Sequence, residues 1–404
     1  MYRVRGRRFS RERAEMTALP ELMELVRRGE DSYVQHKREK IERDRIVAEM
    51  LAFANTRGGR LIFGFDDDGN PVGLTRDEVQ TLSSQIANWA SDSCRPPLYV
   101  ETESVEIALD RLALIVKVNE GVFKPYMSSK GIVWVKEGPD IRMVSSRSEL
   151  LRLYQETGLC QADEQIVRTS DIRDLDVDYW KLFFHKVFDK LPSDVSLSDE
   201  QLLTNMNFMS EGHFNYAGLM FLGKHPQFKL PMFGVKAVIF NGNKIEDRDY
   251  IDRKDFEGKL SDIYDATVRF IVMNIRTVQV EESFNSRGEP EIPRMALEEV
   301  VANALVHRDL LINAPIRVFI FRNRVEIISP GRLPNSLTVE KILMGNTNAR
   351  NPVLGSFAKY AFPYSGIGSG VRRVKELCGD RVQFDNDVVG NQFKVTFLRK
   401  EVHL

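Results

Sequence analysis

Two short runs near the end of the chain most constrain what it can fold into. Residues 298–309 read as an apolar helix in which Glu299 and Asn303 leave the same face, one turn apart. A carboxylate and a carboxamide placed in this way can hold a water molecule and a hard cation such as Mg²⁺. Further on, Gly366, Gly368 and Gly370 directly precede a basic helix, where backbone N–H groups can approach an anion closely. Together the two runs indicate a nucleotide pocket, although neither would do so alone.

Length and composition set the outer limits. A chain of 404 residues with 43% hydrophobic residues should form two or three domains with apolar cores. The formal net charge of −1 neither favours nor excludes a nucleic-acid partner. The 3 cysteines and 6 histidines show no ligand or disulfide spacing, so we expect no zinc site. Because no apolar run is long enough to cross a bilayer, we expect a cytoplasmic protein without a membrane partner.

The hydrophobic periodicity predicts an α+β protein in three parts. Residues 1–158 alternate short helices and strands, as in a compact α+β domain. Residues 159–290 form a less readable, mixed α/β region, which we interpret as a connection. Residues 291–404 read as helix, strand, strand, loop, helix, strand and strand, which predicts a two-layer α/β sandwich.

The opening domain resembles the Schlafen-type AlbA family, a DNA-binding module. The resemblance rests on Gly29-Glu30, on Gln35-His36-Lys37, and on the runs 46–59 and 61–74. It implies nucleic-acid binding, to DNA or RNA, through backbone phosphates in a salt-sensitive and sequence-independent way. The candidate contacts are Lys37, Arg38, Arg57 and Arg60. The alternative is a solvated charged face, since acidic residues are interleaved with these basic ones.

Schlafen proteins have an acidic RNase site with three carboxylates, and the resemblance implies a corresponding site here. Glu30 matches the first and Asp66 or Asp68 the third, but Gln35 stands in place of the second. Metal-dependent cleavage needs charged ligands to hold and orient Mg²⁺. We therefore interpret these residues as the remnant of a nuclease site, and a metal-dependent nuclease is an alternative function.

The last third of the chain resembles the GHKL-type ATPase module of proteins labelled RecG-like helicases or transcriptional regulators. The resemblance rests on residues 251–258, 293–309, 325–334, 350–352 and 366–370. It implies that Asn303 binds Mg²⁺ and that Glu299 is the catalytic base for ATP hydrolysis. It also implies nucleotide contacts by Ser329, Gly331, Arg350, Gly366, Gly368 and Gly370. No glycine-rich P-loop motif occurs, so the chain is not predicted to be a P-loop helicase.

The rate of ATP hydrolysis by this module and the role of Arg308 stay open. Ser329 stands where the wider family has an aspartate that binds the adenine amino group, and a hydroxyl supplies no charge there. With only a short lid over residues 337–350, we expect nucleotide binding rather than efficient turnover, so a weak ATPase activity stays open. Arg308 either contacts a phosphate or another subunit, or forms a salt bridge at the helix end.

The leading hypothesis is a regulatory or defence-type protein that forms a homo-oligomer. In it the GHKL-like module binds ATP and Mg²⁺ and controls assembly, or nucleic-acid engagement by the N-terminal domain. The alternatives are the nuclease and a degenerate scaffold that binds neither ATP nor metal, for which Ser329 is the main argument.

Overall fold

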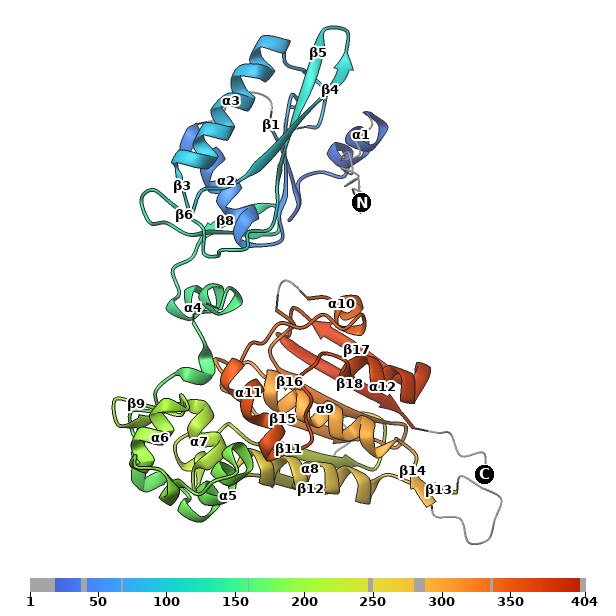
Figure 1. The fold of residues 1–404 in the computed structure, drawn as a ribbon. Coiled ribbons are helices and arrows are strands. Elements are labelled where there is room, and N and C mark those ends of the chain that lie inside the picture. Colours follow the sequence, from blue (N-terminus) through green and yellow to red (C-terminus); the bar gives the residue numbers. More distant parts are fainter. Residues whose placement is uncertain are drawn as a thin grey trace, which may run out of the picture. The chain divides into compact units, whose positions relative to one another are not determined.

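The computed structural model describes residues 19–37, 42–66, 68–158, 160–245, 250–279, 288–334 and 337–399. The chain divides into two compact units, Met1–Thr157 and Gly158–Leu404. Each unit combines helices with a mixed sheet, which confirms the predicted α+β class (Figure 1). Across the described ranges, no helix has the length and apolar character needed to cross a membrane.

A four-stranded sheet in the order β1-β2-β5-β4 organises the N-terminal unit. Its strands are β1 (Val34–Lys37), β2 (Gly59–Phe63), β4 (Val100–Ala108) and β5 (Arg111–Val118). β1 and β2 are parallel because helix α2 (Arg43–Asn55) connects them, whereas the other pairs are antiparallel.

Both faces of this sheet are covered by helices. Since side chains alternate along a strand, Leu61 and Phe63 of β2 face α2 and helix α3 (Arg76–Asp92). Ile62 faces helix α1 (Leu19–Arg27) on the other side. The rest of the unit consists of β3 (Cys94–Arg95), β6 (Met127–Ser128), β7 (Trp134–Glu137), β8 (Asp140–Met143) and α4 (Arg147–Glu156).

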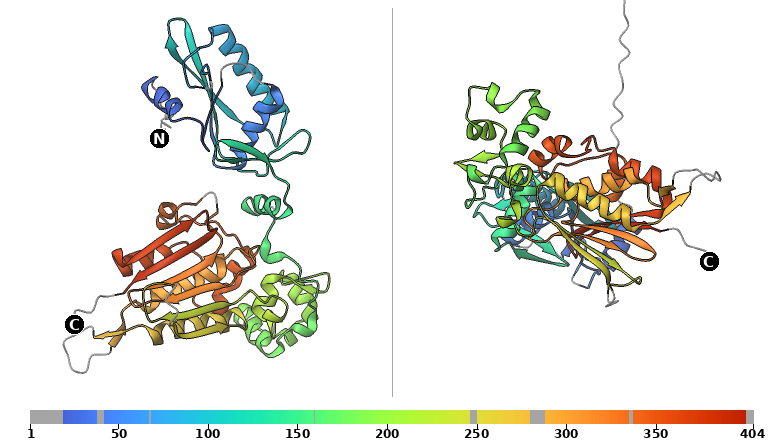
Figure 2. Two further views of the ribbon diagram at one scale, coloured as in Figure 1. Left: turned by 180° about the vertical axis from the view of Figure 1, so that it is seen from behind. Right: turned by 90° about the horizontal axis from the view of Figure 1, so that it is seen from below.

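The C-terminal unit is built on a six-stranded sheet in the order β12-β11-β15-β16-β18-β17. Its strands are β11 (Val235–Phe240), β12 (Tyr250–Phe256), β15 (Ile316–Ile320), β16 (Arg324–Pro330), β17 (Val382–Asp387) and β18 (Gln392–Leu398). Helices α8 (Leu260–Asn274), α9 (Arg294–His307) and α12 (Gly370–Cys378) cover one face of it (Figure 2). This arrangement is the predicted two-layer α/β sandwich.

The predicted connecting region, 159–290, is not a separate body. Its strands β11 and β12 form one end of the sheet, with β11 parallel to β15, and its helix α8 packs against α9. The apolar alternation of β11 was visible in the sequence, but its pairing with a strand some eighty residues later is a long-range contact that periodicity does not reveal. The remainder is mainly helical and contains α5 (Val177–Phe188), α6 (Asp199–Asn205) and α7 (Tyr216–Leu222).

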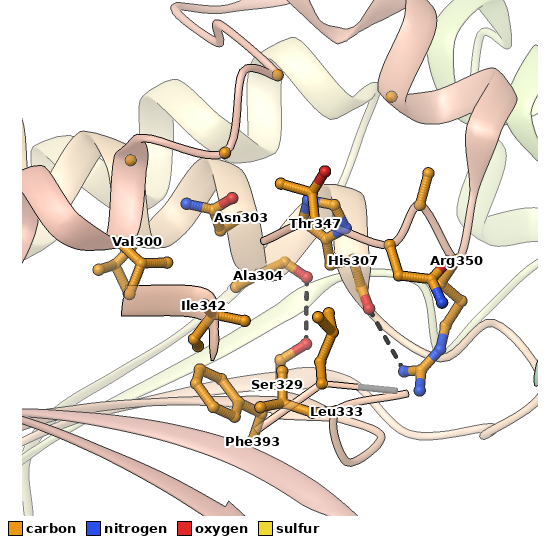
Figure 3. A pocket seen from close by; sticks show the side chains of 18 of the residues that line it. Val300, Asn303, Ala304, His307, Ser329, Leu333, Ile342, Thr347, Arg350 and Phe393 are labelled. Carbon is orange, nitrogen blue, oxygen red and sulfur yellow. Dashed lines mark hydrogen bonds between the residues drawn. The ribbon is translucent and has the colours of Figure 1, made fainter. Parts of the chain in front are cut away.

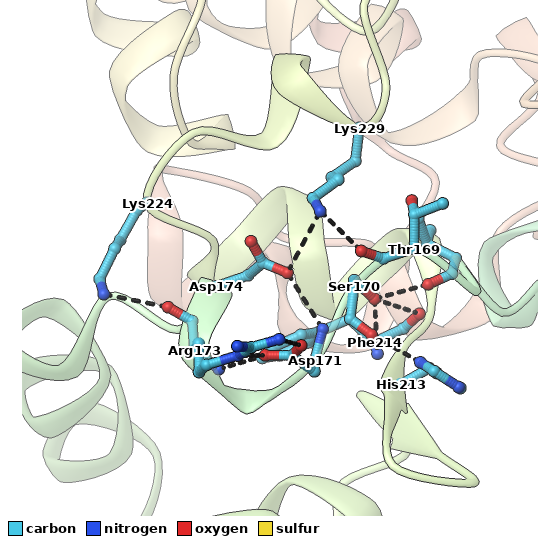
Figure 4. Close-up of polar contacts among 10 residues, drawn as sticks. Thr169, Ser170, Asp171, Arg173, Asp174, His213, Phe214, Lys224 and Lys229 are labelled. Carbon is cyan, nitrogen blue, oxygen red and sulfur yellow. Dashed lines mark hydrogen bonds and ion pairs between the residues drawn. The ribbon is translucent and has the colours of Figure 1, made fainter.

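Polar contacts fasten the first residues of the C-terminal unit to this helical part (Figure 4). The backbone N–H of Val167 donates to the carbonyl of Phe214, at 2.8 Å, and the Ser170 hydroxyl donates to Val167, at 2.7 Å. Lys229 donates to the carbonyl of Thr169, at 2.6 Å. The segment that follows the N-terminal unit is therefore tied to strand β10 (His213–Phe214) and to Lys229.

Candidate functional site

A cavity of about 410 Å³ lies in the C-terminal unit between α9, the end of β16, the segment that follows β16, and the loop before α12 (Figure 3). It brings together all eight nucleotide-site residues predicted for this unit. They are Glu299, Asn303, Ser329, Gly331, Arg350, Gly366, Gly368 and Gly370. The runs that were far apart in the sequence thus meet around one space.

Helix α9 presents Glu299 and Asn303 to this cavity. The Asn303 amide nitrogen donates to the Glu299 carbonyl, at 2.8 Å, and to the Glu299 carboxylate, at 2.9 Å. Both amide N–H groups are thereby used, and an amide oxygen can only accept or coordinate. The Asn303 Oδ1 atom is therefore the end of the amide that suits a hard cation.

The start of α12 can approach α9 closely because its first residue, Gly370, has no side chain. A Cβ at this position would lie 1.7 Å from Glu299 Oε1. Arg373, in the first turn of α12, has a guanidinium nitrogen 4.0 Å from the other Glu299 carboxylate oxygen. The helix begins at Gly370 without a side-chain cap, so its first N–H groups are available to an anion.

The segment that follows β16 packs on the same glycine loop. Gly368 has a φ of +79°, and a Cβ there would lie 2.3 Å from Thr347 and 2.6 Å from the carbonyl of Gly345. Glycine is thus required both for the backbone conformation and for the close approach. The short helix α10 (Val339–Leu343) lies in this segment, and its Ile342 lines the cavity.

The inner end of the cavity is mostly apolar, with one hydroxyl. Its apolar walls come from β16, β17, β18 and the segment after β16, and include Ile327, Leu333, Ile342, Phe384, Phe393 and Val395. The Ser329 hydroxyl donates to the carbonyl of Ala304 on α9, at 3.2 Å. Because its only proton is used there, Ser329 can offer a ligand lone pairs but no proton.

The cavity wall also contains a histidine–tyrosine pair that was not predicted from the sequence. His307 Nε2 lies 2.9 Å from the Tyr364 hydroxyl. Burial, and to a smaller extent Arg350, lowers the pKa of His307 to about 4, so the imidazole is neutral at pH 7. Burial and the Glu299 carboxylate raise the pKa of Tyr364 to about 12. The position of His307, one turn after Asn303 on α9, was a signal that could have identified it.

Arg308 and Arg350 are placed very differently. Arg308 is fully buried and donates to the carbonyl of Ala314, at 2.5 Å, with its guanidinium over the Phe233 ring. It does not line the cavity, and among the described residues it forms no salt bridge, which was the other alternative that the sequence left open. Arg350 lines the cavity and donates to the carbonyl of Arg332, at 2.7 Å.

The basic residues predicted to bind nucleic acid do not form one surface. Lys37 lies on the α2 face of the sheet, 3.1 Å from Glu30, whereas Arg60 lies on the α1 face, 3.7 Å from Glu21. Arg57 is exposed and donates to the hydroxyl of Tyr33, at 3.2 Å. Arg38 lies outside the described residues.

The carboxylates of the predicted nuclease remnant are engaged separately. Glu30 accepts from Lys37, His36 and Gln35. Asp66 accepts from the backbone N–H groups of its own turn, those of Asp68 and Asn70. Within the part of the chain that the structure describes, no group of three His, Cys, Asp or Glu side chains could hold a metal ion.

The C-terminal unit is thus a mixed α/β domain with a cavity between helix α9 and its sheet, and the N-terminal unit is an α+β domain. Family comparisons agree with this class. Residues 30–145 match the family described as "Schlafen, AlbA_2", and residues 313–397 match "Putative ATP-dependent DNA helicase recG C-terminal". The chain thus carries a Schlafen AlbA_2 domain followed by a RecG-type, ATPase-like C-terminal domain, as the motifs predicted. These two domains fit a nucleic-acid-binding, ATPase-type protein.

The second match begins after α9, so the helix with Glu299 and Asn303 lies outside it. No curated protein matches the chain. Among solved structures, the DIP2311 protein from Corynebacterium diphtheriae is similar at 21% identity and a TM-score of 0.47. The similarity covers 92% of this chain and 76% of that one.

Proposed function

We propose that the cavity of the C-terminal unit binds ATP with Mg²⁺, and that its occupancy regulates either assembly into a homo-oligomer or nucleic-acid engagement by the N-terminal domain. The observation that carries this proposal is the convergence of Glu299, Asn303 and the uncapped start of α12 on one cavity. A carboxylate, an amide oxygen and a helix N-terminus are the groups needed for a water, a metal ion and a phosphate.

The polar end of the cavity fits the triphosphate. The N–H groups at the start of α12 would bind phosphate oxygens, and Arg350 would add positive charge at the opposite wall. Asn303 Oδ1 would hold the Mg²⁺, which when bound neutralises charge on the phosphates. Glu299 is held by Asn303 and would orient or deprotonate an attacking water, which makes weak hydrolysis a part of this proposal.

The apolar end fits the base. Ile327, Phe393 and Val395 offer flat apolar surface for a purine, and the lone pairs of Ser329 would accept from the adenine amino group. GTP has a carbonyl oxygen at that position, which needs a hydrogen-bond donor. Ser329 cannot donate to it, because its hydroxyl proton is already bonded to the carbonyl of Ala304. The loss of the aspartate found in the wider family therefore removes charge but keeps the acceptor.

The test is calorimetric titration of ATP with Mg²⁺ into the full chain and into Asn303→Ala. We expect saturable binding by the wild type. In the variant the Kd should be at least tenfold higher, a loss of about 1.4 kcal/mol of binding free energy. Glu298→Ala is the matched control, because Glu298 is the neighbouring carboxylate on α9 and pairs with Arg294 outside the cavity. Its Kd should stay within twofold of the wild type.

Two outcomes would overturn the proposal. Absence of binding by a folded wild type would favour the scaffold alternative. Unchanged affinity in Asn303→Ala would place nucleotide elsewhere.

A further inference from the structure

A fully buried aspartate near the start of the C-terminal unit caps a helix far along the chain. Asp163 lies in the 3₁₀ helix η1 (Ala162–Glu164), and its Oδ2 accepts from the backbone N–H of Leu354, at 2.9 Å. Leu354 is in the first turn of α11 (Pro352–Ala361), whose own N-cap residue, Asn351, makes no side-chain cap. A carboxylate from elsewhere thus serves the unpaired N–H groups and the positive end of α11.

The turn that Asp163 caps also borders the cavity. Arg350 and Pro352 line the cavity directly. Between them, Asn351 is buried and donates to the carbonyls of Val306 and Arg308, at 2.9 and 2.8 Å, at the end of α9. The stretch 350–354 therefore contacts the cavity, the helix that carries Glu299 and Asn303, and Asp163. The Asp163–Leu354 hydrogen bond is thus the contact that joins residues 160–163 to this stretch.

On its other side, Asp163 is close in sequence to Thr157, where the N-terminal unit ends. The residues after Asp163 are fixed to Phe214 of β10 through Val167 and Ser170, and Figure 4 shows Ser170 beside Phe214. Residues 160–163 are thus held between this fixed segment and α11. Among the described residues, the second oxygen of Asp163, Oδ1, has no hydrogen-bond partner and is buried, so the carboxylate is held mainly from the α11 side.

We propose that Asp163 is a positioning residue that links the cavity to the N-terminal unit: a shift of residues 350–354 on nucleotide binding is passed through the Asp163–Leu354 hydrogen bond to the segment that leads to that unit. This inference rests on the proposed function, because nucleotide is the ligand that moves the stretch. The effect of the nucleotide would thus reach the N-terminal unit through the Asp163–Leu354 hydrogen bond and then along the chain from Asp163 to Thr157.

The test is amide hydrogen exchange on the full chain, with and without ATP and Mg²⁺. In the wild type we expect slower exchange with nucleotide both at residues 350–361 and at residues 160–167. In Asp163→Ala the change at 350–361 should persist, whereas that at 160–167 should fall to less than half. Asp163→Asn, which keeps an acceptor for Leu354 without the charge, should give an intermediate change and covers the case that the alanine variant does not fold.

Asp171→Asn is the matched control, since Asp171 caps the neighbouring 3₁₀ helix η2 (Ile172–Asp174) and is not bonded to α11. It should behave as the wild type. If the wild type binds ATP in calorimetry but exchange at 160–167 does not respond, or responds equally in the folded Asp163 variants, the inference is overturned and the proposed function stands. If the wild type binds no ATP, both fall.

Discussion

The cavity of the C-terminal unit and the sheet of the N-terminal unit were both assigned residues from the sequence, with opposite results. In the cavity all eight predicted residues meet. In the N-terminal sheet Lys37 and Arg60 lie on opposite faces, each beside a glutamate. Five of the cavity residues, Glu299, Asn303 and the three glycines of residues 366–370, were chosen for spacing, which a helix turn or a glycine before a helix converts directly into position, and the other three were implied by the family resemblance. The basic residues were chosen for charge, and charge does not specify which face of a strand a side chain occupies.

Among the tests of this comparison, substitution of Arg308 should have the largest effect, and that effect is on stability. Arg308 directly follows the cavity residue His307 but is buried. Arg308→Ala should destabilise the C-terminal unit by on the order of 3 kcal/mol, because it removes a packed side chain and leaves the carbonyl of Ala314 without its donor. Urea unfolding measures the loss. Arg372→Ala, whose side chain is exposed and pairs with Glu376, should change stability by under about 0.5 kcal/mol.

The opposite pattern for Arg308 would break the comparison. A stable Arg308→Ala that has lost ATP affinity would mean that Arg308 reaches a phosphate, as one interpretation of the sequence held. At the end of α9, the charge of a residue would then have predicted a ligand contact better than its spacing in the sequence did.

Gly370 tests whether close approach in the cavity matters for binding. Gly370→Ala puts a methyl group where the Glu299 carboxylate lies, and the side chain of Glu299 can relieve the overlap only by leaving Asn303. We expect ATP affinity to fall at least tenfold, about 1.4 kcal/mol, in calorimetry, with little change in the melting temperature.

A double-mutant cycle isolates that cause. In a Glu299→Ala background the additional cost of Gly370→Ala should largely disappear, because the overlapping carboxylate is gone. Full additivity of the two losses would show that Gly370 acts through the loop backbone alone.

Sequence patterns predicted the elements of this fold better than their partners. The helix over residues 298–307 and the strands of the last third follow from local periodicity, and they supply one wall of the cavity, whereas most of its lining comes from loops and short helices. The place of β11 and β12 in the sheet was not predicted, because strand pairing is decided by contacts far apart in the sequence.

The same limit applies to individual side chains of the site. His307 and Tyr364 are 57 residues apart, and Asp163 and Leu354 are 191 residues apart. No local spacing joins such pairs. The burial of Arg308 was also hidden, since a charged residue after a helix is exposed or paired in most proteins and its carbonyl partners leave no mark in the sequence.

A smaller effect is expected at the apolar end of the cavity. Ser329→Ala removes the acceptor proposed for the adenine amino group, so ATP should bind about fivefold more weakly, or about 1 kcal/mol. GTP, which has no amino group at that position, should bind both proteins equally within error. Parallel titrations of the two nucleotides measure the difference. Equal losses for ATP and GTP would assign Ser329 a purely structural role through Ala304.

The smallest effects concern the N-terminal sheet, where the question is which face contacts nucleic acid. The Arg60 side chain is more exposed than that of Lys37, at 34% against 14%, and its glutamate is farther away, at 3.7 Å against 3.1 Å. We therefore expect Arg60→Ala to weaken binding of a single-stranded or duplex oligonucleotide two- to threefold and to reduce the salt slope by about 1. Lys37→Ala should leave the slope unchanged. A reduced slope for both Lys37→Ala and Arg60→Ala would mean that the nucleic acid contacts both faces of the sheet. Selection by charge alone would then have identified the contacts, and the N-terminal sheet would no longer contrast with the cavity.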